Sequence, residues 1–398
     1  MLNGPFSPWP AFTDEEVAAV TRVLRSNRVN YWTGREGRDF EREFARFADT
    51  EHAIAVANGT TALDLALKGL GIGEGDGAGR DEVIVASRTF LASASSIVTA
   101  GAVPVFADVD RDTQNITAES VATQITPHTR AIIAVHLAGW PCEMDALMAL
   151  AERHDLHVIE DCAQAHGATY RGRSVGSIGH VGCWSFCQDK IMTTGGEGGM
   201  VTTSDRALWQ RMWAYKDHGK SWEAVHEREH PPGFRWLHES FGTNWRMTEM
   251  QAAIGRIQLA RMPGWKAARR ANARRIREAA SQCPGLRVPG IPGHLEHAAY
   301  KAYVFVEPGC LAAGWSRDRI MAEINARGVP CFSGSCSEVY REKAFDGTGW
   351  RPARPLPVAR ELGDTSLMFL CHPTLTEAEI DRTCAVLGEV MQQAGDRG

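Results

Sequence analysis

The chain has 398 residues, of which 44% are hydrophobic and 23% are charged, and its formal net charge at pH 7 is −5. This length allows one large α/β domain with a smaller appendage, and the composition is typical of a globular protein. The slightly acidic balance disfavours binding to nucleic acid or to an anionic membrane. We therefore expect a small molecule or another protein as the partner.

The ends and the cysteines give further limits. The opening residues, MLNGPFSPWPAFTDEE, lack the basic start and apolar core of a signal peptide, and no long apolar run suggests a membrane span. A cytoplasmic location is the default expectation. The ten cysteines include no CxxC pair, and although Cys183 and Cys187 would share one face of an extended strand, no second pair of ligands accompanies them. We expect reduced cysteines and no metal site.

The first predicted element is a helix that begins after Thr13, whose side chain can cap an acidic first turn. A loop with Tyr31, Trp32 and Thr33 follows, before a helix that carries three phenylalanines. Aromatic side chains in a loop usually pack in the interior, but these could also line the mouth of a binding site. We keep both interpretations.

Strand-like runs then alternate with helix-like ones. After a strand that starts at His52, the runs cover residues 82–87, 103–109, 131–136, 157–162, 181–186 and 199–203. Their apolar character is continuous, which indicates strands buried on both faces of a largely parallel sheet. The segments 89–100 and 143–154 are long enough for crossover helices. The pattern predicts an α/β fold.

The second half of the chain has a different pattern. Beyond Trp213 a polar excursion rich in His and Trp is typical of either a lid or a surface loop. Thr248 then caps a long helix, whose later arginines form a solvated face or bind a phosphorylated substrate. From about residue 285, mixed strands and helices suggest a small α+β domain. We expect a large domain over 1–265, with residues 1–30 packing on the small domain, and a small domain over 266–398.

Chemistry-bearing residues follow three of the predicted strands, at the edge where ligands of open α/β sheets bind. Gly59, Thr60 and Thr61 start a helix there, with free N–H groups and two hydroxyls that suit a phosphate. An ordinary helix cap, with Thr60 as the capping hydroxyl, explains the same residues. Ser185 and Lys190 follow another strand and add a hydroxyl and an amine.

Asp161 ends the apolar strand HVIEDC, and a buried carboxylate there requires a cation or hydrogen bonds. Glu160 should point to the opposite side of the strand, so these two carboxylates do not form a pair. Gln164 lies at helical spacing from Asp161 and could add an amide on the same side. A phosphate anchor, a carboxylate for a ring nitrogen and an amine are together what pyridoxal 5'-phosphate requires. Phe90 could stack on its ring, or belong to the core.

Longer stretches of the sequence resemble a known family. They include NGTTALDLAL, TFLASASSIVTAGAVPVFADVD, VHLAGWPCEMD, VIEDCAQAHGA, GCWSFCQDKIMTTGGEGGM and GTNWRMTEMQAAIGRIQL. The chain is similar to pyridoxal-phosphate enzymes of the aspartate-aminotransferase fold (fold type I), in particular to the DegT/DnrJ/EryC1/StrS sugar aminotransferases. The resemblance implies a large domain with a mostly parallel, mixed seven-stranded sheet between helices, and a smaller C-terminal α+β domain.

The resemblance also implies roles for individual residues. Lys190 would bond to the aldehyde of the cofactor and carry protons during the reaction. Asp161 would pair with the pyridinium nitrogen, Gln164 would contact the phenolic oxygen, and Phe90 would stack on the ring.

A second set would bind the phosphate of the cofactor. Gly59, Thr60, Thr61 and Ser185 would do so within one subunit, and Asn244 would reach the phosphate of the neighbouring subunit. A homodimer with shared active sites follows from that role. Asn244 could instead cap the following turn.

Three stretches depart from the family pattern. GIGEGDGAGRDEVIV contains a Gly-rich insertion, which we interpret as a longer surface turn, and ASRTF stands where PSFTF is frequent. The usual histidine-bearing segment of the small domain reads CFSGSCSEVYREKAF, which weakens any transfer of a specific substrate. The glycines at 195–199 are interpreted as a flexible turn that lets the lysine approach the cofactor, because no helix follows them to bind an anion.

The resemblance implies a transaminase that moves an amino group from L-glutamate to a 4-keto or 3-keto deoxysugar on a nucleoside diphosphate, for surface polysaccharide or antibiotic glycosides. Tyr31, Trp32 and Thr33, with residues 331–340, are where we expect the sugar to be chosen. A sugar dehydratase, in which histidine replaces the lysine, is disfavoured by Lys190. A non-catalytic cofactor-binding regulator is the alternative from another class.

Overall fold

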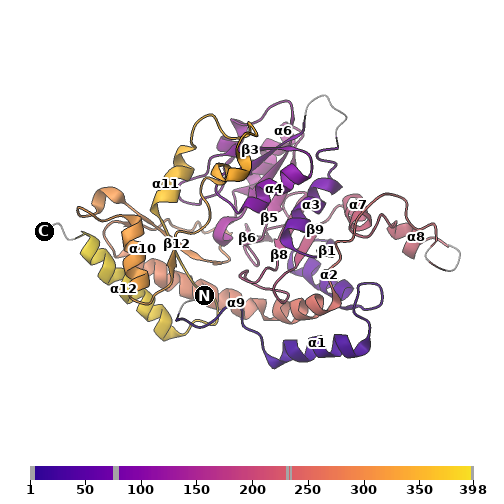
Figure 1. Cartoon of the computed structure of the whole chain (residues 1–398), viewed down its shortest axis with the longest axis horizontal. Coiled ribbons are helices and arrows are strands. Elements are labelled where there is room, and N and C mark those ends of the chain that lie inside the picture. Colours follow the sequence, from indigo (N-terminus) through magenta and orange to yellow (C-terminus); the bar gives the residue numbers. More distant parts are fainter. Residues whose placement is uncertain (1–4, 75–79, 230–232, 234, 396–398) are drawn as a thin grey trace.

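A computed structural model describes residues 5–74, 80–229, 233 and 235–395 of the chain. The Gly-rich insertion predicted as a surface turn includes residues 75–79 and lies outside the described part. The helices and strands that are described form two main sheets with their covering helices, joined by one long helix, and a small third sheet (Figure 1).

The central sheet has seven strands in the order β1-β9-β8-β5-β4-β2-β3. Their bounds are β1 (His52–Val56), β2 (Glu82–Ala86), β3 (Val103–Ala107), β4 (Thr129–Val135), β5 (His157–Asp161), β8 (Val181–Ser185) and β9 (Gly199–Thr203). The strands from β3 to β8 pair in parallel, whereas β9 runs antiparallel to both β1 and β8. The prediction of a mostly parallel, mixed seven-stranded sheet is confirmed.

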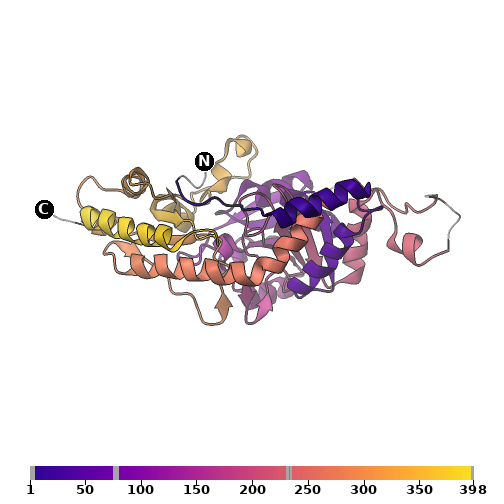
Figure 2. The same ribbon diagram turned by 90° about the horizontal axis from the view of Figure 1, so that it is seen from below.

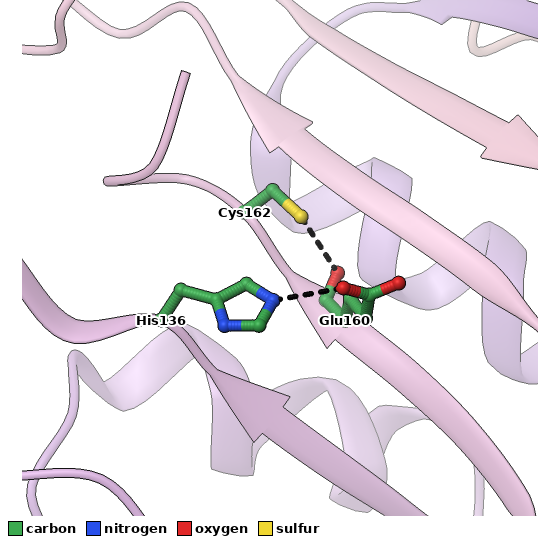
Figure 3. Close-up of side chains that lie close together, drawn as sticks. All are labelled: His136, Glu160 and Cys162. Atoms are coloured by element: carbon green, nitrogen blue, oxygen red, sulfur yellow. Dashed lines mark hydrogen bonds and ion pairs between the residues drawn. The ribbon is translucent and has the colours of Figure 1, made fainter. Parts of the chain in front are cut away.

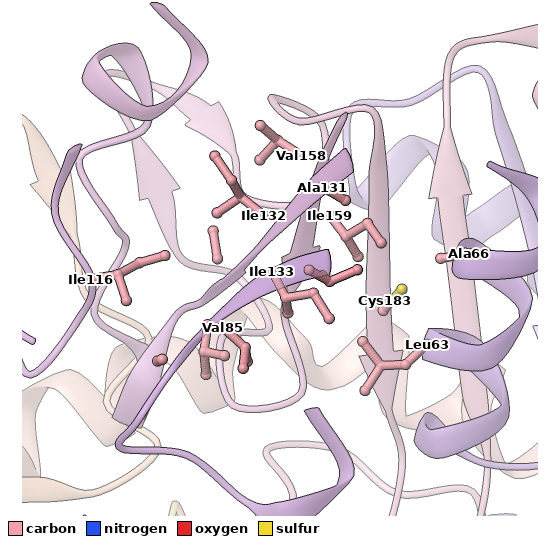
Figure 4. Close-up of a cluster of buried hydrophobic side chains, with 14 of the residues drawn as sticks. Leu63, Ala66, Val85, Ile116, Ala131, Ile132, Ile133, Val158, Ile159 and Cys183 are labelled. Carbon is pink, nitrogen blue, oxygen red and sulfur yellow. The ribbon is translucent and has the colours of Figure 1, made fainter. Parts of the chain in front are cut away.

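Both faces of this sheet are buried, as the continuous apolar runs predicted. In β1, Ile54 and Val56 pack in one apolar cluster, while Ala53 and Ala55 pack in another on the opposite face. The first cluster, shown in part in Figure 4, joins the middle of β2, β4 and β5 to Leu63 and other residues of α3. Because the carboxyl ends of the parallel strands meet at one edge, this packing fixes the positions of the residues that follow them.

Helices cover the two faces. α3 (Gly59–Gly69) packs against α4 (Leu91–Thr99), α7 (Arg206–Lys216), β8 and β9, and α2 (Glu36–Phe47) packs on β1. α5 (Ala118–Ala122) and α6 (Met144–Arg153) lie together, and α6 packs on β5. The predicted crossover helices in 89–100 and 143–154 are α4 and α6.

The second sheet has four strands in the order β10-β12-β14-β13. Its strands are β10 (Leu286–Arg287), β12 (Ala302–Val306), β13 (Cys331–Phe332) and β14 (Ser366–Phe369), and the helices of this region are α10 (Arg317–Ala326), α11 (Pro357–Thr365) and α12 (Glu377–Gly395). A small third sheet is formed by β6 (Thr169–Tyr170), β7 (Arg173–Ser174) and β11 (Leu295–Glu296). The strand and helix mixture expected after residue 285 is therefore found.

α9 (Glu249–Ser281) connects the two sheets as a single helix of 33 residues. It contacts α1 (Asp14–Ser26) and α2 at one end and α12, β10 and β12 at the other (Figure 2). Thr248 caps it, as predicted. The boundary expected between residues 265 and 266 lies inside this helix. Its arginines are not all solvated, because Arg269 is 1% exposed and lies over the ring of Trp9, which corrects the solvated-face interpretation at that position.

The N-terminal segment contacts both parts. Ser7 donates from its backbone N–H and its hydroxyl to the carboxylate of Glu379 in α12, at 2.5 and 3.0 Å. Further along, Arg261 of α9 pairs with Glu16 of α1 at 2.7 Å. No described helix is both long enough and apolar enough to cross a membrane.

Candidate active site

Lys190 lies in the turn after β8, at the carboxyl edge of the central sheet. Its backbone is fixed on both sides, because its N–H donates to the carbonyl of Cys187 at 3.0 Å and its carbonyl accepts from the indole of Trp9 at 2.8 Å. Its amine is 3.5 Å from a carboxylate oxygen of Asp189 and 5.4 Å from the ring centre of Tyr300. The side chain lines a cavity of about 230 Å³, where an amine can meet a small molecule.

Asp161 ends β5 and is 7% exposed. One of its carboxylate oxygens accepts from the hydroxyl of Ser93 at 2.8 Å and the other from the N–H of Ala163 at 3.1 Å. Among the described residues no Lys, Arg or His side chain forms an ion pair with it. Because a buried carboxylate without a cation is costly, this group fits a protonated nitrogen supplied by a ligand.

Glu160 points to the other side of β5, as predicted, and belongs to a separate cluster with His136 and Cys162 (Figure 3). Its carboxylate accepts from His136 Nε2 at 2.9 Å and from three backbone N–H groups, those of Gly176, Ile178 and Gly179. The other ring nitrogen of His136 accepts from the N–H of Cys142. Burial alone would raise the pKa of Glu160, but these hydrogen bonds hold its pKa below the ordinary value. The cluster is a saturated structural network.

The start of α3 forms a cradle for an anion. The capping residue is Asn58, whose side chain accepts from the N–H of Thr61 at 2.9 Å; the alternative that assigned the cap to the hydroxyl of Thr60 is therefore wrong. The Thr61 hydroxyl donates back to the Asn58 carbonyl at 2.7 Å. The N–H groups of Gly59 and Thr60 lie in the first turn, where no intrahelical acceptor exists, and the helix end favours negative charge.

Ser185 lies directly against this helix start. A Cβ atom added at Gly59 would be 2.6 Å from Cβ of Ser185, and one added at Gly199 would be 2.3 Å from the carbonyl oxygen of Asn58. Glycines at these two positions therefore let the end of β8, the start of β9 and the start of α3 approach one another. In the turn between the strands, Gly195 and Gly196 have φ of +89° and +120°, which favours glycine.

Phe90 and Gln164 lie on the same cavity as Lys190. Phe90 is 70% exposed, which is unusual for an aromatic side chain at the edge of a sheet and leaves its face open to a ligand. The side-chain oxygen of Gln164 accepts from the N–H of Ala138 at 2.7 Å, so its NH₂ group remains as the donor. Both positions agree with contacts to a bound ring.

Of the predicted residues, Phe90, Gln164 and Lys190 line this cavity, whereas Asp161, Ser185 and the start of α3 stand at strand and helix ends of the same sheet edge. The remaining four predicted residues lie elsewhere in the chain. Tyr31 is 3% exposed, donates its hydroxyl to Glu41 at 3.0 Å and belongs to the core, so the prediction that it contacts a substrate is corrected. The ring centre of Trp32 lies 4.7 Å from the amine of Lys220, and the hydroxyl of Thr33 donates to the side-chain oxygen of Asn30 at 3.1 Å. Asn244 is exposed and pairs through its backbone with Asp217.

Several residues that the sequence did not single out also form the site. The hydroxyl of Tyr300 donates to Asp189, and Lys301 lines the cavity beside it. Arg88 is fully buried next to the cavity segment Thr89–Phe90. No sequence motif marks these residues. Tyr300 and Lys301 stand at the edge of an apolar run, and Arg88 follows a strand, which are positions that many residues without a function also occupy.

The residues fit one cofactor. A group that carries a phosphate, a basic ring nitrogen and an aldehyde would find the α3 cradle, the carboxylate of Asp161 and the amine of Lys190 along one edge of the central sheet. Pyridoxal 5'-phosphate is such a group. A mixed sheet of this order with these residues along its carboxyl edge defines a fold type I, pyridoxal-phosphate-dependent aminotransferase.

Comparison with known proteins gives the family. A model described as the DegT/DnrJ/EryC1/StrS aminotransferase family matches residues 10–388, and the chain belongs to that family. It is 36% identical to a dTDP-3-amino-3,4,6-trideoxy-alpha-D-glucose transaminase of Streptomyces venezuelae, with 98% of this chain and 94% of the relative covered. It is 38% identical to a GDP-perosamine synthase of Caulobacter vibrioides, with 90% and 92% covered.

Solved structures agree. The aminotransferase from Psychrobacter cryohalolentis is 63% identical and superposes with a TM-score of 0.95, over 98% of this chain and 100% of the other. DesV of Streptomyces venezuelae, in complex with a ketimine intermediate, is 36% identical with a TM-score of 0.84, over 95% of each chain. The chain is an aminotransferase and depends on pyridoxal 5'-phosphate.

Proposed function

We propose that this protein transfers an amino group from L-glutamate to a keto group of a deoxysugar carried on a nucleoside diphosphate. Two observations support the reaction: the amine of Lys190 lines a cavity, and Asp161, at the end of β5, is a buried carboxylate with no cationic side chain paired to it among the described residues. The names of the curated relatives support the class of acceptor, because they describe transaminases and synthases of nucleotide-linked amino sugars.

The chain's own residues supply binding and proton transfer. When bound, pyridoxal 5'-phosphate supplies an aldehyde and an electron-accepting ring. Asp161, held by Ser93, would keep a ring nitrogen protonated, and the α3 cradle with Ser185 would hold the phosphate. The amine of Lys190 would act as the general base that takes a proton from the α-carbon of the donor and would hold it as an ammonium group, which would then return it as the general acid. Asp189, which accepts from Tyr300, keeps that amine oriented.

We further propose that two copies of the chain share their active sites. In support, the segment that carries α8 (Trp222–His226) extends from the body at one end of the molecule (Figure 1). Trp236 and Phe241, between α8 and Asn244, are 82% and 99% exposed. Large exposed apolar side chains on one segment are typical of an interface. Asn244 would then serve the cofactor of the partner.

Absorbance and product analysis test the reaction. Purified protein should absorb in the visible range, L-glutamate should bleach that absorbance, and a panel of nucleotide-linked keto sugars should yield one aminated product by mass. Lys190→Ala should abolish the transfer, whereas Lys343→Met, at an exposed position, should not change it. Full transfer by Lys190→Ala would disprove the role of the amine.

The same experiment separates the two alternatives. A dehydratase would release water from the sugar and leave the product without nitrogen. A regulator would bind the cofactor but show no spectral change with any amino donor.

A further inference from the structure

A second amine lies at the same cavity as Lys190. Lys301 immediately precedes β12, and its side chain lines the cavity with Lys190, Phe90 and Gln164. The amine of Lys301 is 4.8 Å from the ring centre of Tyr300, and the amine of Lys190 is 5.4 Å from the same ring. Two lysines thus share one aromatic neighbour, although the proposed reaction uses only Lys190.

Positive charge exceeds negative charge around Lys301. Arg269 is buried nearby and donates to the carbonyl of Tyr300 at 3.4 Å, while its Nε and Nη2 have no hydrogen-bond partner in the described part of the chain. Asp189 is the one carboxylate among the described residues that line the cavity, and it already accepts from Tyr300 and pairs with Lys190. No ion pair is formed by Lys301 within the described residues. The pocket therefore has a cation that lacks an anionic partner.

The other groups that face Lys301 do not supply the missing charge. Burial raises the pKa of the Cys371 thiol, and burial lowers the pKa of His372 to about 3, so both side chains are neutral at pH 7. Burial, and then the charge of Arg269, lower the pKa of Lys301 to about 8. Lys301 is thus mostly protonated at pH 7 and loses its charge a little above that pH.

Lys301 also borders a larger cavity, of about 1,030 Å³, between α9 and residues 288–297. The basic side chains of that cavity are already engaged. Lys266 and Arg270 both pair with Glu296, and Arg277 donates to the carbonyl of Pro289. Lys301 is therefore a cation without an anionic partner among the described residues, and its side chain also lines the smaller cavity that Lys190 lines.

The size of the catalytic cavity limits the ligand. Its volume of about 230 Å³ is below the roughly 300–1,000 Å³ of pockets that hold drug-sized molecules, so a nucleoside diphosphate does not fit inside it. A single carboxylate group is much smaller, and it needs only the part of the cavity that a cofactor ring beside Phe90 and Gln164 would leave. An ammonium group is a compact charge that suits such a ligand, and hydrogen bonds between charged groups are among the stronger ones.

We propose that Lys301 is a carboxylate-binding residue for the amino donor, and that it holds one carboxylate of a dicarboxylic amino acid close to Lys190. This inference rests on the proposed function, because it assumes that an amino acid is the donor. Lys301 is then a residue that selects the amino donor. Binding of the acceptor sugar should not depend on Lys301.

Two half-reactions test this assignment. Lys301→Met keeps the length of the side chain and removes its charge, and Lys343→Met is the matched control at an exposed position. With glutamate alone, Lys301→Met should raise the half-saturating glutamate concentration by about 10- to 100-fold, the effect of losing one hydrogen bond to a charged group. The limiting rate should change by less than about 3-fold. With the aminated enzyme and the keto sugar, its half-saturation should equal that of the wild type.

Binding of glutarate to the holoenzyme, measured by calorimetry, gives a readout that needs no turnover. Wild type should bind this dicarboxylate and lose affinity as the pH rises through about 8, because Lys301 must be protonated to bind an anion; Lys301→Met should bind it about 10-fold more weakly, with no such pH dependence. Lys301→Arg should recover part of the affinity.

Other outcomes overturn the inference. Unchanged glutamate and glutarate binding in Lys301→Met would show that Lys301 does not bind the donor. A loss confined to the keto-sugar half-reaction would show that Lys301 binds an anionic group of the acceptor instead. If glutamate does not convert the wild type at all, the proposed donor is wrong, and the glutarate titration still decides whether Lys301 binds a carboxylate.

Discussion

Arg88 should connect the central sheet to the segment that shapes the catalytic cavity. Its guanidinium is fully buried and donates to the side-chain oxygens of Gln114, Ser337 and Ser366, at 3.0, 2.7 and 2.8 Å. Ser337 follows the cavity residues 334–336, and Ser366 begins β14. One side chain therefore joins the end of β2 to two elements of the second sheet region.

The loss of stability expected on replacing Arg88 is the difference between two opposing effects. Each hydrogen bond to a charged group contributes about 1.5–3 kcal/mol, but burying the guanidinium costs several kcal/mol, and burial does lower the pKa of Arg88. Ser337 and Ser366 also keep bonds to the carbonyls of Ala359 and Leu362. We expect Arg88→Met to destabilise the fold by only ~1–3 kcal/mol, equivalent to ~1–4 °C in the thermal midpoint for a chain of this size.

The effect on the site should exceed the effect on stability, because the cavity segment loses its anchor. Half-saturation by the keto sugar should rise about 10-fold or more, with Arg360→Met as the control at an exposed position of α11. Thermal unfolding and the acceptor half-reaction measure the two effects. If Arg88→Met has the stability and the sugar half-saturation of the wild type, Arg88 does not position the segment.

Three further predictions concern the cofactor side of the site. Asp161→Asn should lower turnover by at least ~100-fold while the protein still binds cofactor, because the amide does not hold a ring nitrogen protonated; turnover and absorbance check this. Gly59→Ala should weaken cofactor binding by ~10-fold or more in a titration of the cofactor-free protein, since its Cβ would lie 2.6 Å from that of Ser185. Glu160 has a lowered pKa, so its stabilisation is present above pH ~4.5 and is lost as the pH falls through the lower pKa of the folded state. Glu160→Gln should remove this part of the acid destabilisation, as followed by unfolding at pH 7 and pH 4.

The strands could be predicted because their burial on two faces leaves a mark in each local run. In β4, residues 131–135 form an unbroken apolar run, and no residue from another part of the chain is needed to identify it as a strand. The direction of β9, unlike its position in the sequence, could not be predicted from a local run. Its antiparallel pairing with β1 and β8 depends on where the turn at 186–198 returns the chain, which no local pattern gives. The long helix after Thr248 could be predicted from its own pattern, and α9 is that helix. What the pattern does not give is its packing against α1 and α2 at one end and α12 at the other, which places the expected domain boundary at residue 265 inside the helix.

The catalytic residues could be predicted for a related reason. Asp161 and Ser185 end strands of the sheet and Lys190 follows one, and the carboxyl edge brings such positions together whatever lies between them in sequence. Lys301 and Tyr300 come from the second sheet, and they reach the cavity only through the packing of the two sheets. Tyr31 is a case in which the sequence left two interpretations open, packing in the interior or lining a binding site. The structure fits the first, because Lys216 and Glu41, from separate elements, contact its ring and hydroxyl.

Two departures from the family pattern are one feature of this structure. ASRTF contributes Arg88, and CFSGSCSEVYREKAF contributes Ser337, and the two side chains are 2.7 Å apart. A return to the frequent PSFTF pattern, Arg88→Phe, would place an aromatic ring against the hydroxyl of Ser337, which costs free energy because a polar group loses its partner. Ser337→Ala removes that hydroxyl. The two substitutions together should therefore destabilise less than the sum of each alone, by about 1 kcal/mol in a double-mutant cycle. Additive effects would show that the two segments vary independently.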